Sequence, residues 1–173
     1  MFVPHLRARI VGFTAAAVAV LAVGTALLRA HAAPEATFTI VANTTSANAG
    51  QNFNGVAKGR LAITVPPGTP VHVKFMNAKS APLPHSFQVI PLKGTPQAPV
   101  LPAQAEAQPA FPGAATPNAG IPGTQPGQSA DVRFTATKAG QYLFICGYPG
   151  HALLGMYGTF DVTPGAKPDM VVK

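Results

Sequence analysis

Seven short runs of β-forming residues, separated by turn signals, constrain the fold of this chain more than any other feature. In Val71-His72-Val73-Lys74-Phe75 the apolar side chains alternate, as in a strand with one buried face. No stretch beyond residue 32 has the periodicity of an amphipathic helix. Regularly spaced short strands of this kind predict an all-β sandwich. The seven runs cover residues 37–41, 60–65, 71–76, 86–90, 131–137, 141–146 and 157–162.

The connections between the runs predict how some strands follow one another. Residues 66–68, Pro-Pro-Gly, suit a type II turn, with Pro and Gly at its central positions. Residues 137–140, Thr-Lys-Ala-Gly, predict a β-hairpin between the runs on either side. Both faces of residues 142–146 are apolar, so we expect this strand to be central and covered on both sides.

One long segment does not fit the strand pattern. Residues 91–128 contain nine Pro and five Gly in 38 positions, with Phe111 as the only aromatic residue. Such a segment cannot form a core of its own. We expect a Pro/Gly/Ala-rich loop that covers the sandwich, with Phe111 as its anchor and a brief helical turn near 103–108.

The first 32 residues predict an export segment. Arg7 and Arg9 precede an uncharged apolar run, residues 10–28, and residues 30–32 have the small-x-small form of a signal-peptidase site. A helix of 19 residues spans roughly 28 Å, close to the hydrocarbon thickness of a membrane. We therefore expect one N-terminal hydrophobic helix, either a signal peptide or a membrane anchor, in residues 1–32. Residues 33–173 then form one domain in the periplasm or on the outer face of the cytoplasmic membrane.

Charged residues are scarce, which excludes several classes of protein. Beyond residue 32 there are nine basic and five acidic residues, a formal charge of +4. Lys58 and Arg60 are the closest basic pair there, so the basic stripe of a nucleic-acid binder is missing. The scattered carboxylates disfavour an enzyme that uses paired acids. Because few ion pairs can be lost on acidification, we expect an acid-tolerant fold.

Residues able to bind a metal gather near the end of the chain. A lone cysteine in an exported domain has no internal disulfide partner, so Cys146 has to be buried or bound. Cys146, His151 and Met156 follow at five-residue intervals in a loop between two strands, and His85 opens another strand. A thiolate, two imidazoles and a thioether suit copper in both oxidation states. Each alone could also be an ordinary core or loop residue.

His72 is the competing imidazole. It lies in mid-strand without neighbouring ligands, so we expect it to face solvent.

The chain resembles the cupredoxins, the type I blue copper proteins, and the sulfocyanins in particular. A distant His followed by Cys-x4-His-x4-Met is the arrangement of rusticyanins and sulfocyanins. Residues 51–55 resemble the sulfocyanin motif Phe-Asn-Phe-Asn-Gly, from which Gln51 departs, and residues 59–66 match Gly-x-Leu-x-Ile-x-Val-Pro. The resemblance covers roughly residues 37–163 and implies a Greek-key β-sandwich with one type I copper.

The resemblance also implies roles for individual residues. His85, Cys146, His151 and Met156 would bind the copper, and the backbone N–H of Ser86 would point at the thiolate. The chain would be a monomeric one-electron carrier, not an enzyme, in a respiratory chain leading to a haem-copper terminal oxidase. A cytochrome complex or an oxidase would dock on the apolar surface around His151, formed by Tyr148, Pro149, Ala152, Leu153 and Leu154.

Other functions stay open at the level of the sequence. A copper storage or delivery protein would also bind copper, usually through several Met or His ligands in an open site that exchanges the metal readily. A multicopper oxidase or a copper nitrite reductase needs further His-rich clusters, for which only His72 is spare. A metal-free sandwich, or a Cys-His nucleophile without an evident orienting acid, is the remaining alternative.

Overall fold

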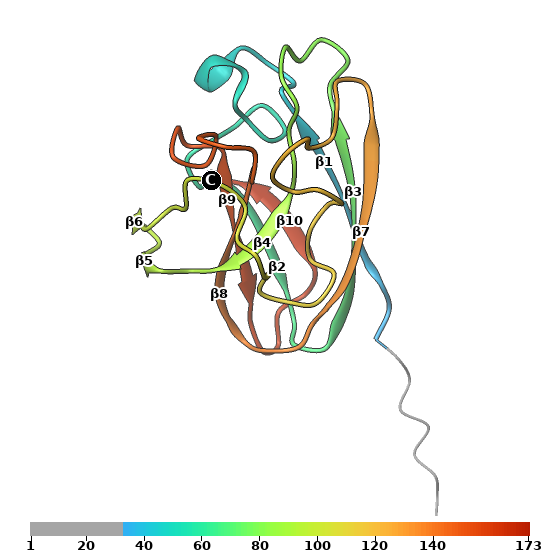
Figure 1. Cartoon of the computed structure of the whole chain (residues 1–173). Helices are drawn as coiled ribbons and strands as arrows, with labels where there is room; N and C mark the ends of the chain where they lie inside the picture. The colour runs from blue at the N-terminus through green and yellow to red at the C-terminus, as the bar shows by residue number, and fades with distance from the viewer. Residues whose placement is uncertain (1–32) are drawn as a thin grey trace, which may run out of the picture. The chain divides into compact units, whose positions relative to one another are not determined.

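Two β-sheets build the domain in the computed structural model, which describes residues 33–173 (Figure 1). The first sheet has the order β1-β3-β7 and the second the order β10-β2-β9-β8-β4. The strands of the first sheet are β1 (Ala36–Ala42), β3 (Thr69–Asn77) and β7 (Ser129–Ala136). Those of the second are β2 (Leu61–Val65), β4 (Gln88–Pro91), β8 (Gly140–Ile145), β9 (Tyr157–Val162) and β10 (Asp169–Val172). All seven predicted strands are present, and the predicted all-β sandwich is confirmed.

Three further strands were not predicted. β10 adds to the edge of the second sheet, and β5 (Gly94–Thr95) and β6 (Ala98–Pro99) form a small hairpin inside the 91–128 segment. The one helical element among residues 33–173 is the 3-10 turn η1 (Ala47–Gly50). The helical turn expected near 103–108 is therefore absent.

The expected N-terminal helix lies in residues 1–32, outside the described part of the chain. Within residues 33–173, no helix has the length and apolar character needed to cross a membrane.

The connection between β7 and β8 differs from the prediction. Residues 137–139 do not close a hairpin, because β7 pairs with β3 whereas β8 pairs with β4 and β9. The turn instead carries the chain from one sheet to the other, as do residues 66–68 between β2 and β3. A turn sequence determines a local change of direction, but it does not determine which strands share hydrogen bonds.

The hydrophobic core lies between the two sheets and is rich in phenylalanine. Phe144 and Cys146 point into it from β8 and its end, whereas Leu143 and Ile145 pack on the opposite face with Ile90. The prediction that this strand is covered on both sides is confirmed. Burying each such aromatic or aliphatic side chain stabilises the fold by about 1.5–3 kcal/mol.

Phe111 anchors the long 91–128 segment, as predicted. The side chain is 2% exposed, and its ring centroid lies 4.8 Å from that of Tyr142 and 5.6 Å from that of Phe134. The segment therefore contributes one aromatic side chain to the core although it has no core of its own.

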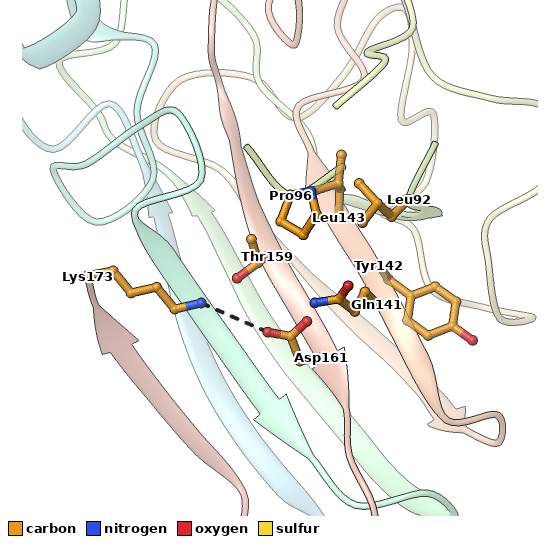
Figure 2. Close-up of a pocket in the computed structure, with 8 residues that line it drawn as sticks. All are labelled: Leu92, Pro96, Gln141, Tyr142, Leu143, Thr159, Asp161 and Lys173. Atoms are coloured by element: carbon orange, nitrogen blue, oxygen red, sulfur yellow. Dashed lines mark ion pairs between the residues drawn. The ribbon is translucent and has the colours of Figure 1, made fainter. Parts of the chain in front are cut away.

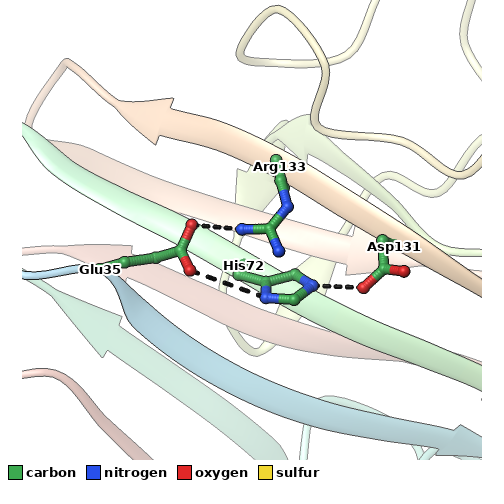
Figure 3. A network of polar contacts seen from close by, with 4 residues as sticks. All are labelled: Glu35, His72, Asp131 and Arg133. Carbon is green, nitrogen blue, oxygen red and sulfur yellow. Dashed lines mark hydrogen bonds and ion pairs between the residues drawn. The ribbon is translucent and has the colours of Figure 1, made fainter.

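His72 does not face solvent, and that prediction is wrong. It lies on β3 but is only 5% exposed, because Glu35, directly before β1, and Asp131 on β7 cover its ring (Figure 3). Nε2 is in contact with an Asp131 oxygen, and Nδ1 lies 3.7 Å from Glu35, which also pairs with Arg133. The hydrogen bond with His72, more than the charges of His72, Arg133 and Lys74, lowers the pKa of Asp131.

This contact predicts a pH-dependent contribution of Asp131 to stability. A carboxyl group whose pKa is lowered in the folded state stabilises the fold above its ordinary pKa, and the effect is lost as the pH falls through the lowered value. We expect Asp131→Asn to reduce the free energy of unfolding at pH 6 and to reduce it less near pH 2, as measured by denaturant unfolding. Asp169→Asn, at an exposed carboxylate, is the matched control; equal destabilisation by Asp131→Asn at both pH values would contradict the assignment.

Candidate metal centre

The pairing of β4 with β8 brings the candidate ligands together. The two strands are antiparallel, with Gln88 opposite Ile145, so the residues just before β4 lie beside the residue just after β8. His85 and Cys146 are thus neighbours although 61 positions separate them. His151 lies in the loop that follows, and Met156 immediately precedes β9.

Backbone hydrogen bonds close the loop from Cys146 to Met156. The N–H of Cys146 donates to the carbonyl of Met156 at 3.0 Å, and the N–H of Met156 donates to the carbonyl of His151 at 3.0 Å. The N–H of His151 donates to the carbonyl of Tyr148 at 3.1 Å, and this hydrogen bond closes a turn after Cys146. These bonds set the positions of the three residues relative to one another without any metal.

The side-chain donor atoms of three residues form a small buried triangle. Cys146 Sγ lies 3.7 Å from Nδ1 of His85 and 3.4 Å from Nδ1 of His151, and the two nitrogens are 3.1 Å apart. A point in the plane of these atoms is about 2.0 Å from each, close to the length of a metal–imidazole bond. The triangle therefore fits a small transition-metal ion.

The fourth candidate, Met156, completes a soft donor set. Its side chain is fully buried in the same core cluster as Cys146, and its main-chain carbonyl accepts a hydrogen bond from the N–H of Cys146. Two imidazoles and a thiolate near one plane, with a weakly binding thioether, suit copper, whereas calcium and magnesium require oxygen ligands. The residues present thus fit a type I copper ion.

Burial determines the protonation of these side chains. It raises the pKa of Cys146 to about 11, against the opposing effect of hydrogen bonds from Ser86 and Tyr148. Burial, and next the neighbouring His151, lowers the pKa of His85 to about 4, and burial also lowers the pKa of His151. A fully buried thiol with a raised pKa is a poor nucleophile, which disfavours the Cys-His nucleophile considered from the sequence.

Ser86 contacts the sulfur as the resemblance implied. Its backbone N–H donates to Cys146 Sγ at 3.4 Å. The Ser86 hydroxyl, for which the sequence indicated no partner, donates to the carbonyl of Ala119 and accepts from the N–H of Gly147 at 2.8 Å. Both partners are main-chain groups, and no residue pattern indicates such contacts in advance.

Comparisons with known proteins agree with this geometry. Residues 24–165 match the sulfocyanin (SoxE) domain family. The chain belongs to the sulfocyanin family. This is a family of blue copper electron carriers, and the buried His, Cys and Met set is consistent with one type I copper per sulfocyanin domain.

Two curated relatives share part of the sequence. Sulfocyanin of Sulfolobus acidocaldarius is 38% identical over 114 residues, which cover 65% of this chain and 56% of that protein. Auracyanin-B of Chloroflexus aurantiacus is 34% identical over 116 residues, which cover 64% of this chain and 49% of that protein. The chain thus spans about half the length of the curated relatives that it matches.

A solved structure supports the fold. Auracyanin from Roseiflexus castenholzii, reduced with dithionite, superposes with a TM-score of 0.50 at 27% sequence identity. The match covers 75% of this chain and 98% of that one. The cupredoxin-type sandwich that the resemblance implied is therefore confirmed.

The surface around the centre differs in one residue from the expected apolar surface. Leu153 and Leu154 are more than half exposed, and Tyr148 and Pro149 are partly exposed. Ala152 is buried, because it packs with Leu143 and Ile145 on the outer face of the second sheet. We call residues 146–156, between β8 and β9, the copper loop, and define its apolar surface as Tyr148, Pro149, Leu153 and Leu154.

A small cavity elsewhere on the second sheet offers no comparable site. Its volume is about 30 Å³, which holds about one water molecule. Lys173 lies 4.0 Å from Asp161 at its edge, and the buried hydroxyl of Thr159 has no hydrogen-bond partner among the described residues (Figure 2). A single carboxylate beside a lysine does not form a cation site.

The pKa values predict that copper uptake releases a proton. With a pKa near 11, the Cys146 thiol is protonated at pH 7, whereas the imidazole of His85, with a pKa near 4, is already neutral. Binding of the thiolate to Cu(II) should therefore release about one proton per ion, and the affinity should rise with pH between about pH 5 and 9. Calorimetric titration in two buffers of different ionisation enthalpy measures this number. Cys146→Ser should abolish the release; copper binding by the wild-type protein without proton release would contradict the assignment.

Proposed function

We propose that this chain is an exported one-electron carrier whose single copper is bound by His85, Cys146, His151 and Met156. The preformed triangle of two Nδ1 atoms and one Sγ, each within 3.7 Å of the others, is the observation that carries the proposal. When bound, the copper supplies the Cu(II)/Cu(I) couple. The residues contribute a set of ligands that main-chain hydrogen bonds already hold, so that little has to move when an electron arrives or leaves.

Burial favours a carrier over the alternative functions. His85, Cys146, His151 and Met156 are each 3% exposed or less, so a substrate in solution would not reach their donor atoms. A storage or delivery protein has to exchange its metal readily, and four buried ligands held by main-chain hydrogen bonds disfavour such exchange. The burial of all four side chains also disfavours an enzyme, because a substrate needs access to the metal.

The main experiment is the addition of Cu(II) to the purified domain. We expect an intense blue thiolate-to-copper absorption that ascorbate bleaches and an oxidant restores. Cys146→Ser should abolish the colour. Met156→Leu should keep the colour and raise the reduction potential, because a weak donor that favours Cu(II) is lost. A colourless product would contradict the carrier function, and rapid loss of copper to a mild chelator would favour delivery.

We further propose that redox partners dock on the apolar surface of the copper loop. Leu153 and Leu154 are 56% and 58% exposed and lie two and three positions after His151 in the chain. An uncharged apolar surface of this kind suits small, transient contacts with a partner. A cytochrome complex as donor and a haem-copper terminal oxidase as acceptor fit a respiratory role for a monomeric carrier.

Electron self-exchange tests this docking surface without a natural partner. Two copies that meet through Leu153 should exchange electrons readily, and Leu153→Glu should slow the exchange by at least about tenfold at low ionic strength through like-charge repulsion. The line widths of nuclear magnetic resonance signals in mixtures of oxidised and reduced protein give the rate. Thr137→Glu introduces the same charge at the opposite end of β8 and should have little effect. Equal rates in Leu153→Glu and the wild type would contradict the assignment.

We also propose that residues 1–32 are a signal peptide or a membrane anchor and that residues 33–173 form the cupredoxin domain outside the cytoplasm. Arg7 and Arg9 before the apolar run 10–28 support the orientation. The mass of the native protein distinguishes a cleaved N-terminus from an uncleaved one.

A further inference from the structure

The 91–128 segment does more than cover the sandwich. Its part from residue 103 to residue 124, called here the strap, contacts the main chain on both sides of the metal centre. We propose that the strap positions the copper ligands and that Gln88 fastens it. This inference rests on the ligand set of the proposed function.

The strap first holds His85. The N–H of His85 donates to the carbonyl of Thr124 at 3.1 Å, and the N–H of Thr124 donates back to His85 at 2.8 Å. Nε2 of His85 is buried and has no hydrogen-bond partner among the described residues. Because no polar contact holds the far side of the ring, its position depends on packing and on these two bonds to the strap.

The strap also orients the hydroxyl of Ser86. This hydroxyl has one proton, which it donates to the carbonyl of Ala119 in the strap, while its oxygen accepts from Gly147 at 2.8 Å. Cys146 Sγ lies 3.9 Å away. Of the two donors of Ser86, only the backbone N–H is therefore left for the sulfur. The carbonyl of Ala119 thus limits the number of hydrogen bonds to the thiolate.

The strap lies directly against the copper loop. The N–H of Ala105 donates to the carbonyl of Gly147 at 2.8 Å, and the N–H of Gly150 donates to Ala103 at 2.7 Å. A Cβ at position 147 would lie 2.6 Å from Cβ of Ala105 and 2.7 Å from the carbonyl oxygen of Ala119. Glycine directly after Cys146 therefore permits the close approach of the two segments.

Two buried side chains fasten the strap beside the centre. The side chain of Gln88, 2% exposed, donates to the carbonyl of Glu106 at 2.7 Å and accepts from the N–H of Glu106 at 2.9 Å. The hydroxyl of Thr116 lies 3.3 Å from both the N–H and the carbonyl of Phe87. Gln88 and Phe87, through which the strap is held, lie within three residues of His85 along the chain. Removing these hydrogen bonds should therefore change the position of His85 without removing any group that contacts the metal.

Gln88→Met tests the proposal, because it keeps the length of the side chain and removes both bonds to Glu106. In the metal-free protein we expect at least tenfold faster hydrogen exchange at the Gly147 and Thr124 amides. In the copper-loaded protein we expect at least tenfold faster copper release to a chelator and a broadened copper hyperfine pattern in the spin-resonance spectrum. The matched control is Thr95→Val, which removes the bond from the Ala98 N–H to Thr95 in the β5–β6 hairpin of the same segment. It should leave all three quantities unchanged.

The outcomes are distinguishable. The Phe160 amide in β9 reports global opening, and its exchange should be equal in the variant and the wild type. Unchanged exchange at Gly147 and Thr124 in Gln88→Met would overturn the positioning role, as would an equal acceleration at Phe160. If Gln88→Met does not fold, Thr116→Val removes the second fastening and gives the same test. A wild-type protein that never turns blue would overturn the proposed function, while exchange in the metal-free state would still test the strap.

Discussion

The antiparallel pairing of β4 with β8 is the interaction on which the metal centre depends. It places Gln88 opposite Ile145, and so brings His85 and Ser86 next to Cys146. The rest of the loop follows from local hydrogen bonds between Cys146, His151 and Met156. A register shift of one residue would turn the side chains of β4 to the other face of the sheet, and the two imidazoles would no longer meet.

Burial of polar donor atoms is the principal energetic cost of this arrangement. A thiol and two imidazoles are held almost without contact with water. Burial raises the pKa of the thiol and lowers the pKa of both imidazoles, so that it favours the neutral form of each group. The donors offset part of the cost by contacting one another and the Ser86 N–H. A metal that binds only the folded state adds to this stabilisation, so metal binding and folding are coupled.

The scarcity of charge has a structural counterpart. Four of the five carboxylates of residues 33–173, Glu35, Glu106, Asp131 and Asp161, lie within 4.0 Å of a basic side chain, which for Asp131 is the buried His72, and none belongs to the metal centre. Beside the copper loop the surface is instead apolar, with Leu153 and Leu154 exposed. Protonation of the carboxylates in acid therefore affects contacts at the surface and the contact with His72, and the copper loop holds no carboxylate that could be neutralised.

The sequence alone determined the strand-rich pattern, the four candidate ligands and the anchoring role of Phe111, because alternation, loop spacing and residue chemistry are local properties. Only the tertiary structure decided that β7 and β8 belong to different sheets, that Glu35 and Asp131 cover His72, and that the strap holds His85 through Thr124 and Ser86 through Ala119. These features depend on main-chain groups and on segments that lie far apart in the chain. Backbone N–H and C=O groups are the same at every residue except proline, so no residue pattern specifies which of them will meet.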